Sequence, residues 1–143
     1  MGKFGYHVID ADGHGGDLDN WQTRIPAQFQ PQWAERKAKI AKQFANLIGV
    51  GVKETKGTAK VDAGARAGMT DPKARLEDMD LEGIDQTVMF PGGAGEEWAG
   101  LDRDFAIALC RTLNDARAEF LRYDPKRLKS VAKLVLTELK RGG

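Results

Sequence analysis

The sequence predicts an α/β domain built on a parallel β-sheet. Three observations lead to this fold class. The 143 residues are enough for one domain with a real core, and 41% apolar with 30% charged residues is normal for a globular protein. Segments typical of strands and helices alternate in the order strand, helix, strand, helix, strand. Such alternation indicates parallel strands joined by right-handed crossovers.

The first strand is predicted over residues 6–11, and a polar, glycine-rich segment follows over 13–20. A helix is predicted over residues 32–47, because large apolar residues recur there at roughly helical spacing among basic ones: Trp33, Ile40, Phe44 and Leu47. The polar stretch 49–69 contains five glycines up to Gly68 and few large apolar residues, and we expect a long loop there.

The next helix is predicted over residues 72–82, where both ends carry clear signals. Asp71 suits an N-cap, and Pro72 suits the first helical position, where its missing N–H is not needed. Gly83 suits the left-handed position that ends a helix. Helical spacing then places two residues toward the core: Leu76 and Met79.

A second strand is predicted over residues 86–90, stopped by Pro91-Gly92-Gly93. A long helix follows over 102–122 and ends before Asp124-Pro125. The third strand is predicted over 130–136. The long helix has an apolar stripe with steps of three or four residues: Phe105, Leu109, Leu113, Ala116 and Phe120.

Charge and cysteine content narrow the functional classes. The formal net charge is +1, and acidic and basic residues are interspersed, so a nucleic-acid partner is not expected. Cys110 is the single cysteine, which excludes an internal disulfide and fits a reducing cytoplasm. Its place in the long helix predicts a small buried apolar residue rather than a nucleophile. Neither a signal peptide nor a membrane-spanning run is present, so no membrane partner is expected.

The most informative motif is the cluster of Asp10, Asp12 and His14 at the end of the first strand. Residues two apart on a strand project to the same side, so all three side chains are predicted to point into one volume. Carboxylate and imidazole together are typical of a site for zinc or another divalent metal. Asp10 lies within the strand, and a structural hydrogen-bonding role is favoured for it. In the alternative reading, Asp12 caps the turn and His14 makes a loop hydrogen bond.

Four segments of the chain resemble the amidohydrolase-related family of metal-dependent enzymes, which includes proteins similar to aminocarboxymuconate-semialdehyde decarboxylase. The segments occur in the family's order: 8–14, 71–85, 88–92 and 110–132. The resemblance implies a (β/α)8 TIM barrel with its site at the carboxyl ends of the strands. Because such a barrel needs about 250 residues, we expect residues 1–143 to form its N-terminal part, about three βα units.

The resemblance also implies the site residues. Asp12 and His14 take the place of the metal pair on the family's first strand. The metal is expected to be zinc, with manganese as the second choice. The family's further ligands come from later strands and cannot be placed here, so binding by this chain alone should be weak. Four residues are assigned weakly to substrate binding: Asp17, Trp21, Gly92 and Gly93.

The expected function is that of a metal-dependent hydrolase or non-oxidative decarboxylase acting on a small-molecule substrate, with this chain inactive alone. The alternative is a non-catalytic interaction or oligomerisation module. An unpaired edge on the third strand favours pairing with another chain, including a second copy. A weaker alternative is nucleotide binding through the glycines of residues 92–95, whose spacing matches neither a Walker loop nor a dinucleotide fingerprint.

Overall fold

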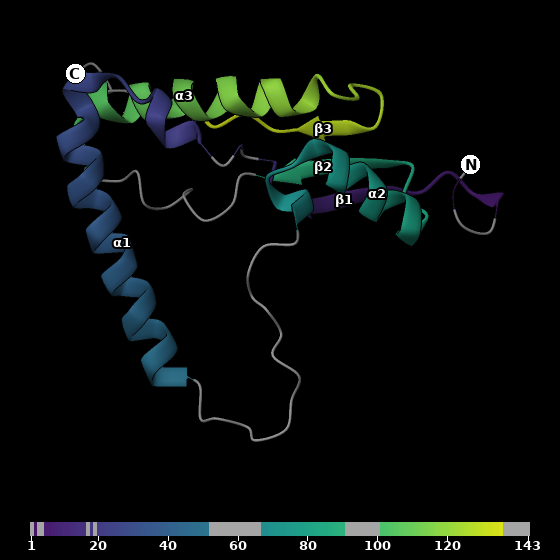
Figure 1. Cartoon of the computed structure of the whole chain (residues 1–143), viewed down its shortest axis with the longest axis horizontal. Helices are drawn as coiled ribbons and strands as arrows, with labels where there is room; N and C mark the ends of the chain where they lie inside the picture. The colour runs from purple at the N-terminus through teal and green to yellow at the C-terminus, as the bar shows by residue number, and fades with distance from the viewer. Residues whose placement is uncertain are drawn as a thin grey trace, which may run out of the picture. The chain divides into compact units, whose positions relative to one another are not determined.

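The computed structural model describes residues 2, 5–16, 18, 20–51, 67–90 and 101–135 (Figure 1). The chain divides into two compact units. One contains Met1–Ile25 and Ala65–Gly143, and the other contains Pro26–Gly64. The second unit holds the short helix η3 (Ala27–Phe29) and the helix α1 (Gln30–Gly51). The first unit carries the sheet and the residues of the metal motif, and the expectation of one barrel domain over the whole chain stays a prediction.

The first unit is a small parallel sheet with helices, which confirms the mixed α/β class. Its strands are β1 (Ile9–His14), β2 (Gln86–Phe90) and β3 (Leu128–Ser130), in the order β1-β2-β3. Both neighbouring pairs run parallel. The short helices η2 (Trp21–Arg24) and η4 (Ala67–Met69) and the helices α2 (Pro72–Glu82) and α3 (Arg103–Leu121) complete it.

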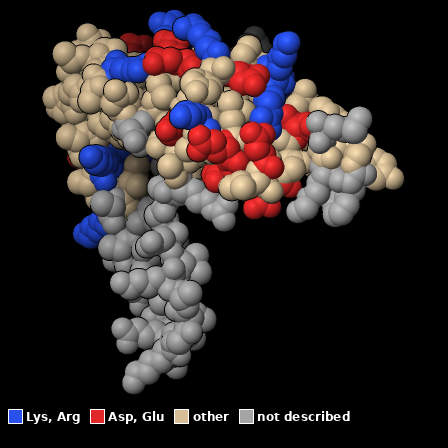
Figure 2. All heavy atoms as spheres, turned by 45° about the vertical axis from the view of Figure 1, so that its right-hand side comes forward, with Lys and Arg blue, Asp and Glu red and all other residues tan. Residues whose placement is uncertain are grey.

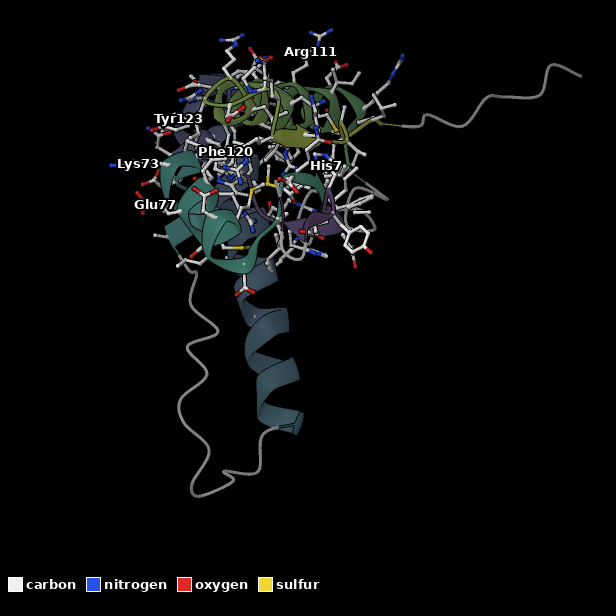
Figure 3. The ribbon with its side chains drawn as sticks, turned by 90° about the vertical axis from the view of Figure 1, so that its right-hand side faces the viewer. His7, Lys73, Glu77, Arg111, Phe120 and Tyr123 are labelled. Carbon is white, nitrogen blue, oxygen red and sulfur yellow. The ribbon has the colours of Figure 1, made fainter. Side chains whose placement is uncertain are left out.

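The core lies between the sheet and its two crossover helices. Met79 from α2 and Phe120 from α3 pack against Met89 of β2 and Leu128 of β3, and all four are 2% exposed or less. In Figure 3 Phe120 lies inside the ribbon, whereas Arg111 of the same helix points away from it. Both crossover helices therefore cover the same face of the sheet.

The predicted helix over 72–82 is confirmed at both ends. The Asp71 carboxylate accepts a hydrogen bond from Lys73 N, and Pro72 opens α2. Gly83 adopts φ +75°, and its N–H donates to the carbonyl oxygens of Asp80 and Met79. Met79 is buried, and Leu76 packs beside it.

The long helix is confirmed as well. Asp102 caps α3 by accepting a hydrogen bond from Phe105 N at 3.0 Å. The predicted stripe is buried along the helix: Phe105, Leu109, Leu113, Ala116 and Phe120. Cys110 is also buried, as expected of a small apolar residue. Burial raises the pKa of its thiol, so the group is protonated at neutral pH.

The second strand has its predicted bounds, but the other two strands are displaced. β1 begins at Ile9 rather than residue 6, because pairing starts only where Val8 meets the N–H groups of Asp85 and Gln86. β3 begins at Leu128 rather than residue 130. Beyond β3, the backbone of Lys133 bonds to the Asn114 side chain instead of to a strand. Its N–H donates to Asn114 Oδ1 at 2.9 Å, and its carbonyl oxygen accepts from Asn114 Nδ2 at 2.8 Å. Leu136 lies outside the described residues.

The predicted long loop is shorter at both ends than expected. Helix α1 continues to Gly51, four residues beyond the predicted end at residue 47, and η4 occupies Ala67–Met69. Residues 52–66 of that loop lie outside the described part of the chain. Within the ranges that the structure describes, no helix has the length and apolar composition needed to cross a membrane.

Candidate metal site at the end of the first strand

The carboxyl end of β1 contains a β-bulge. Asp10 pairs with Thr87, and Gly13 pairs with Met89, so β1 advances three residues where β2 advances two. Ala11 and Asp12 therefore lie opposite the single residue Val88. An extra residue of this kind bends the strand and changes the direction of the side chains that follow it.

The bulge separates Asp10 from the other two residues of the motif. Asp10 pairs with Thr87, which is 1% exposed, and Asp10 Oδ2 accepts a hydrogen bond from Thr87 Oγ1 at 3.1 Å on the helix-covered side. His14 pairs with Phe90 and is exposed on the other side. The prediction that all three side chains share one side is wrong for Asp10, because the extra residue reverses the alternation. Its contacts fit the structural role favoured above.

Gly13 is the position at which this arrangement needs glycine. It is buried between Asp10 and Met89, and a Cβ there would lie 2.4 Å from Thr87 Oγ1 and 3.1 Å from Asp10 Oδ2. No side chain fits without moving these polar atoms. The glycine thus leaves room beside the bulge for the hydrogen bond between the Thr87 hydroxyl and the Asp10 carboxylate.

His14 presents one ring nitrogen for a ligand. Its Nδ1 lies 3.1 Å from the backbone oxygen of Asp12. Because a carbonyl oxygen only accepts, this contact is a hydrogen bond in the tautomer that carries the proton on Nδ1. Nε2 then keeps a free electron pair on an exposed side chain. Histidines that bind metals are held in this way, with the second nitrogen donating to a carbonyl or carboxylate.

The backbone that follows is tied to η4 and to the first turn of α2. We call residues Asp12–Gly16 the ligand turn. The N–H of Gly16 donates to Met69 O at 2.9 Å, and Arg75 Nη2 donates to His14 O. Gly15 has φ +99°, and a Cβ there would lie 3.0 Å from Met69 O, which favours glycine.

Asp12 and His14 do not by themselves make a complete metal site. Among the described residues, no group of three or more His, Cys, Asp or Glu side chains is placed to hold a metal ion. Tetrahedral zinc sites use three or four protein ligands. The remaining ligands must come from elsewhere if the pair binds metal.

The other predicted site residues are only partly placed. Trp21 opens η2 and is half-buried. At the end of the same short helix, Arg24 Nη1 lies 2.6 Å from Glu119 Oε2 of α3, and the guanidinium lowers the pKa of Glu119. Asp17, Gly92 and Gly93 lie outside the described residues, so their assignment to substrate binding stays a prediction.

Sequence reasoning missed Arg75 and Thr87 as members of this region. Arg75 donates to His14 O, 61 residues away. Nothing local predicts such a contact. Thr87 carries a recognisable signal, because a polar residue on the core-facing side of a strand needs a hydrogen-bonding partner.

The opposite end of the strands has a pocket of about 460 Å³. His7, Asp85 and Arg127 line it, each next to the start of a strand (His7 is labelled in Figure 3). Its charges are paired: Arg127 Nη1 lies 2.7 Å from Asp80 Oδ1, and Arg127 also donates to the carbonyls of Ile84 and Asp85. Asp85 Oδ2 accepts from Val8 N at 2.9 Å, which lowers the Asp85 pKa. These contacts connect the starts of the strands to one another. The pocket therefore lies at the opposite end of the strands from the ligand turn.

The described residues on the face shown in Figure 2 do not add a second candidate. On the face in Figure 2, acidic side chains gather near the middle with Lys and Arg around them. Two basic side chains of the first unit form ion pairs. Lys73 pairs with Glu77, one turn along α2, at 3.9 Å, and Arg24 of η2 pairs with Glu119 of α3. Pairs of this kind are typical of a solvated surface.

Comparison with known proteins gives a structural relationship alone. No family model matches the chain, and no curated protein sequence matches it. Five solved chains match by structure. Among them is 5-carboxyvanillate decarboxylase from Novosphingobium aromaticivorans, an amidohydrolase-superfamily enzyme solved with manganese and 4-hydroxy-3-methoxy-5-nitrobenzoic acid. The match has a TM-score of 0.58 and 16% identity, covering 92% of this chain. The chain spans 34% of the length of that enzyme.

Proposed function

We propose that this chain is the N-terminal part, about three βα units, of a (β/α)8 barrel of the amidohydrolase superfamily. The strands follow sequence order, and both crossovers cover one face, which is how a barrel is wound. A doubly wound sheet instead reverses its strand order and places helices on both faces. The match to one third of a decarboxylase of that superfamily supports the same assignment.

The proposed role of Asp12 and His14 is to supply the first two metal ligands. The observation that carries this proposal is the His14 ring, which is exposed at the carboxyl end of β1 with Nδ1 engaged and Nε2 open. Barrel enzymes place their sites at that end of the strands. A carboxylate with an imidazole suits zinc or manganese, and the related decarboxylase contains manganese.

The proposed reaction is metal-dependent hydrolysis or non-oxidative decarboxylation of a small-molecule substrate. A bound divalent metal polarises a carbonyl or carboxylate oxygen or activates water. The aromatic acid bound to the related decarboxylase makes an aromatic carboxylate the first substrate class to test. Trp21, Asp17, Gly92 and Gly93 are proposed to contact it. With two ligands described, we expect no turnover by this chain alone.

The direct test of the metal role is titration of the 143-residue chain with Mn²⁺, with free ion followed by electron paramagnetic resonance. We expect weak binding that falls at least tenfold in His14→Ala and in Asp12→Asn, in line with loss of a ligand. His7→Ala is the matched control, because His7 is an exposed histidine at the other end of β1. Equal binding by the wild type, His14→Ala and His7→Ala would exclude the proposed site.

A further inference from the structure

We propose that Arg75 and Asp10 are positioning residues, which fix the ligand turn so that Asp12 and His14 present their side chains to a metal. Neither residue needs to touch the metal. The inference rests on the proposed metal role of His14, but its first readout is the His14 ring itself and requires no metal.

Asp10 acts on the beginning of the ligand turn. At a bulge, a backbone N–H leaves the ladder and needs another acceptor. The N–H of Asp12 donates to Asp10 Oδ1 at 3.1 Å, and Asp10 Oδ2 accepts from Thr87 Oγ1 at 3.1 Å. One carboxylate thus connects the bulged residue to the buried hydroxyl of the neighbouring strand. This connection fixes where the Asp12 carbonyl, the partner of the His14 ring, is placed.

Arg75 acts on the end of the ligand turn. Its guanidinium reaches from the first turns of α2 to the carbonyl of His14, and the neighbouring Gly16 N–H is held by Met69 O. Arg75 Nε is buried without a hydrogen-bond partner in the described structure. Burying an unsatisfied donor is unfavourable, so the guanidinium is held here by its Nη2 contact with the backbone of the candidate ligand and not by Nε.

The two contacts together account for the Nδ1–H tautomer that we expect for His14. The ring bonds to Asp12 O across two residues of its own chain. An exposed segment holds such a contact only if its backbone is fixed at both sides of it. Asp10 fixes the backbone at Asp12, and Arg75 fixes the backbone at His14.

The test is a long-range ¹H–¹⁵N spectrum of the metal-free chain labelled on histidine, with Arg75→Met and Thr87→Val compared with the wild type. His7 and His14 are the only histidines, so His7 serves as an internal reference. We expect wild-type His14 in the Nδ1–H tautomer, and averaging between tautomers in both variants. Lys73→Met is the matched control, because Lys73 lies on the outer side of the same helix (Figure 3). Its spectrum should equal that of the wild type.

A conservative variant separates positioning from folding. Arg75→Lys keeps one donor near His14 O and should restore part of the Nδ1–H signal. Near-ultraviolet circular dichroism confirms that each variant is folded. If Arg75→Met fails to fold, Thr87→Val carries the comparison. An unchanged His14 spectrum in folded Arg75→Met, or in folded Thr87→Val, overturns the inference.

Mn²⁺ titration of the same variants distinguishes the two proposals. If His14→Ala weakens binding and Arg75→Met weakens it about tenfold, both proposals are supported. If His14→Ala weakens binding and Arg75→Met binds as the wild type does, the positioning role falls and the metal role survives. If the His14 tautomer depends on Arg75 while Mn²⁺ binding is independent of His14, the metal role falls and the control of the ring survives.

Discussion

At the scale of single residues, the directions of the side chains at the end of β1 depend on the pairing of β1 with β2. The alternation of side chains along a single strand does not predict them. The Asp-x-Asp-x-His spacing predicts one shared side for Asp10, Asp12 and His14. One inserted residue in the ladder sends Asp10 to the core side and leaves His14 exposed on the other. The cluster was predictable from sequence. Its geometry was not, because a register shift depends on the neighbouring strand, 77 residues away.

Gly13→Ala should destabilise the first unit. The added Cβ would lie 2.4 Å from Thr87 Oγ1 and displace the Asp10–Thr87 hydrogen bond. Overpacking of this kind costs about 1–3 kcal/mol, measured as the change in free energy of unfolding by urea. Ala11→Ser, at an exposed neighbour, is the control. A loss below about 0.5 kcal/mol for Gly13→Ala would show that the bulge relaxes freely.

Asp85 should make stability depend on acid pH. Its pKa is lowered by the hydrogen bond from Val8 N, so its contribution is present above the unfolded-state pKa of about 3.9 and is lost as pH falls through the lower folded pKa. Asp85→Asn should therefore have a lower urea midpoint than the wild type at pH 7, and the difference should shrink below about pH 4. Glu77→Gln, on an exposed pair, is the control. A pH-independent difference would argue against this linkage.

At the scale of elements, the helices were predicted better than the strands because their signals are local. Asp71, Pro72 and Gly83 are sufficient to define α2, and apolar periodicity defines α3. β1 and β3 are displaced because their ends depend on partners: Val8 on the turn before β2, and Lys133 on Asn114. A strand's composition does not contain that information.

Asp71→Ala should weaken the start of α2. The substitution leaves Lys73 N without its capping carboxylate, which costs about 1 kcal/mol for a typical N-cap. The loss is read from urea unfolding. Lys73→Ala removes only an exposed pair with Glu77 and should change stability by less than about 0.5 kcal/mol. Equal losses in the two variants would mean that the cap is not the stabilising contact.

At the scale of the whole molecule, the question is what the sheet face opposite α2 and α3 does. Ile9, Phe90 and Val131 are exposed there by 53%, 39% and 38% in the described structure. A barrel would bury this face, since its interior is filled with side chains. The interaction-module alternative stays a prediction, because no observation identifies a partner.

We expect the chain alone to self-associate because of this exposed apolar face. Size-exclusion chromatography with light scattering should show a mass that rises with protein concentration. Phe90→Lys, which places a charge on the face, should shift the chain toward the monomer. A concentration-independent monomer would contradict the barrel interpretation, whereas a discrete dimer unaffected by Phe90→Lys would favour an interaction module that uses another surface.

The central claim is that the first strand ends in a metal pair formed by Asp12 and His14. Electron spin-echo modulation of the Mn²⁺-loaded chain measures nitrogen coordination directly. The account predicts modulation from one histidine nitrogen that disappears in His14→Ala and persists in His7→Ala. Modulation that persists in His14→Ala, or none in the wild type at saturating Mn²⁺, would contradict it.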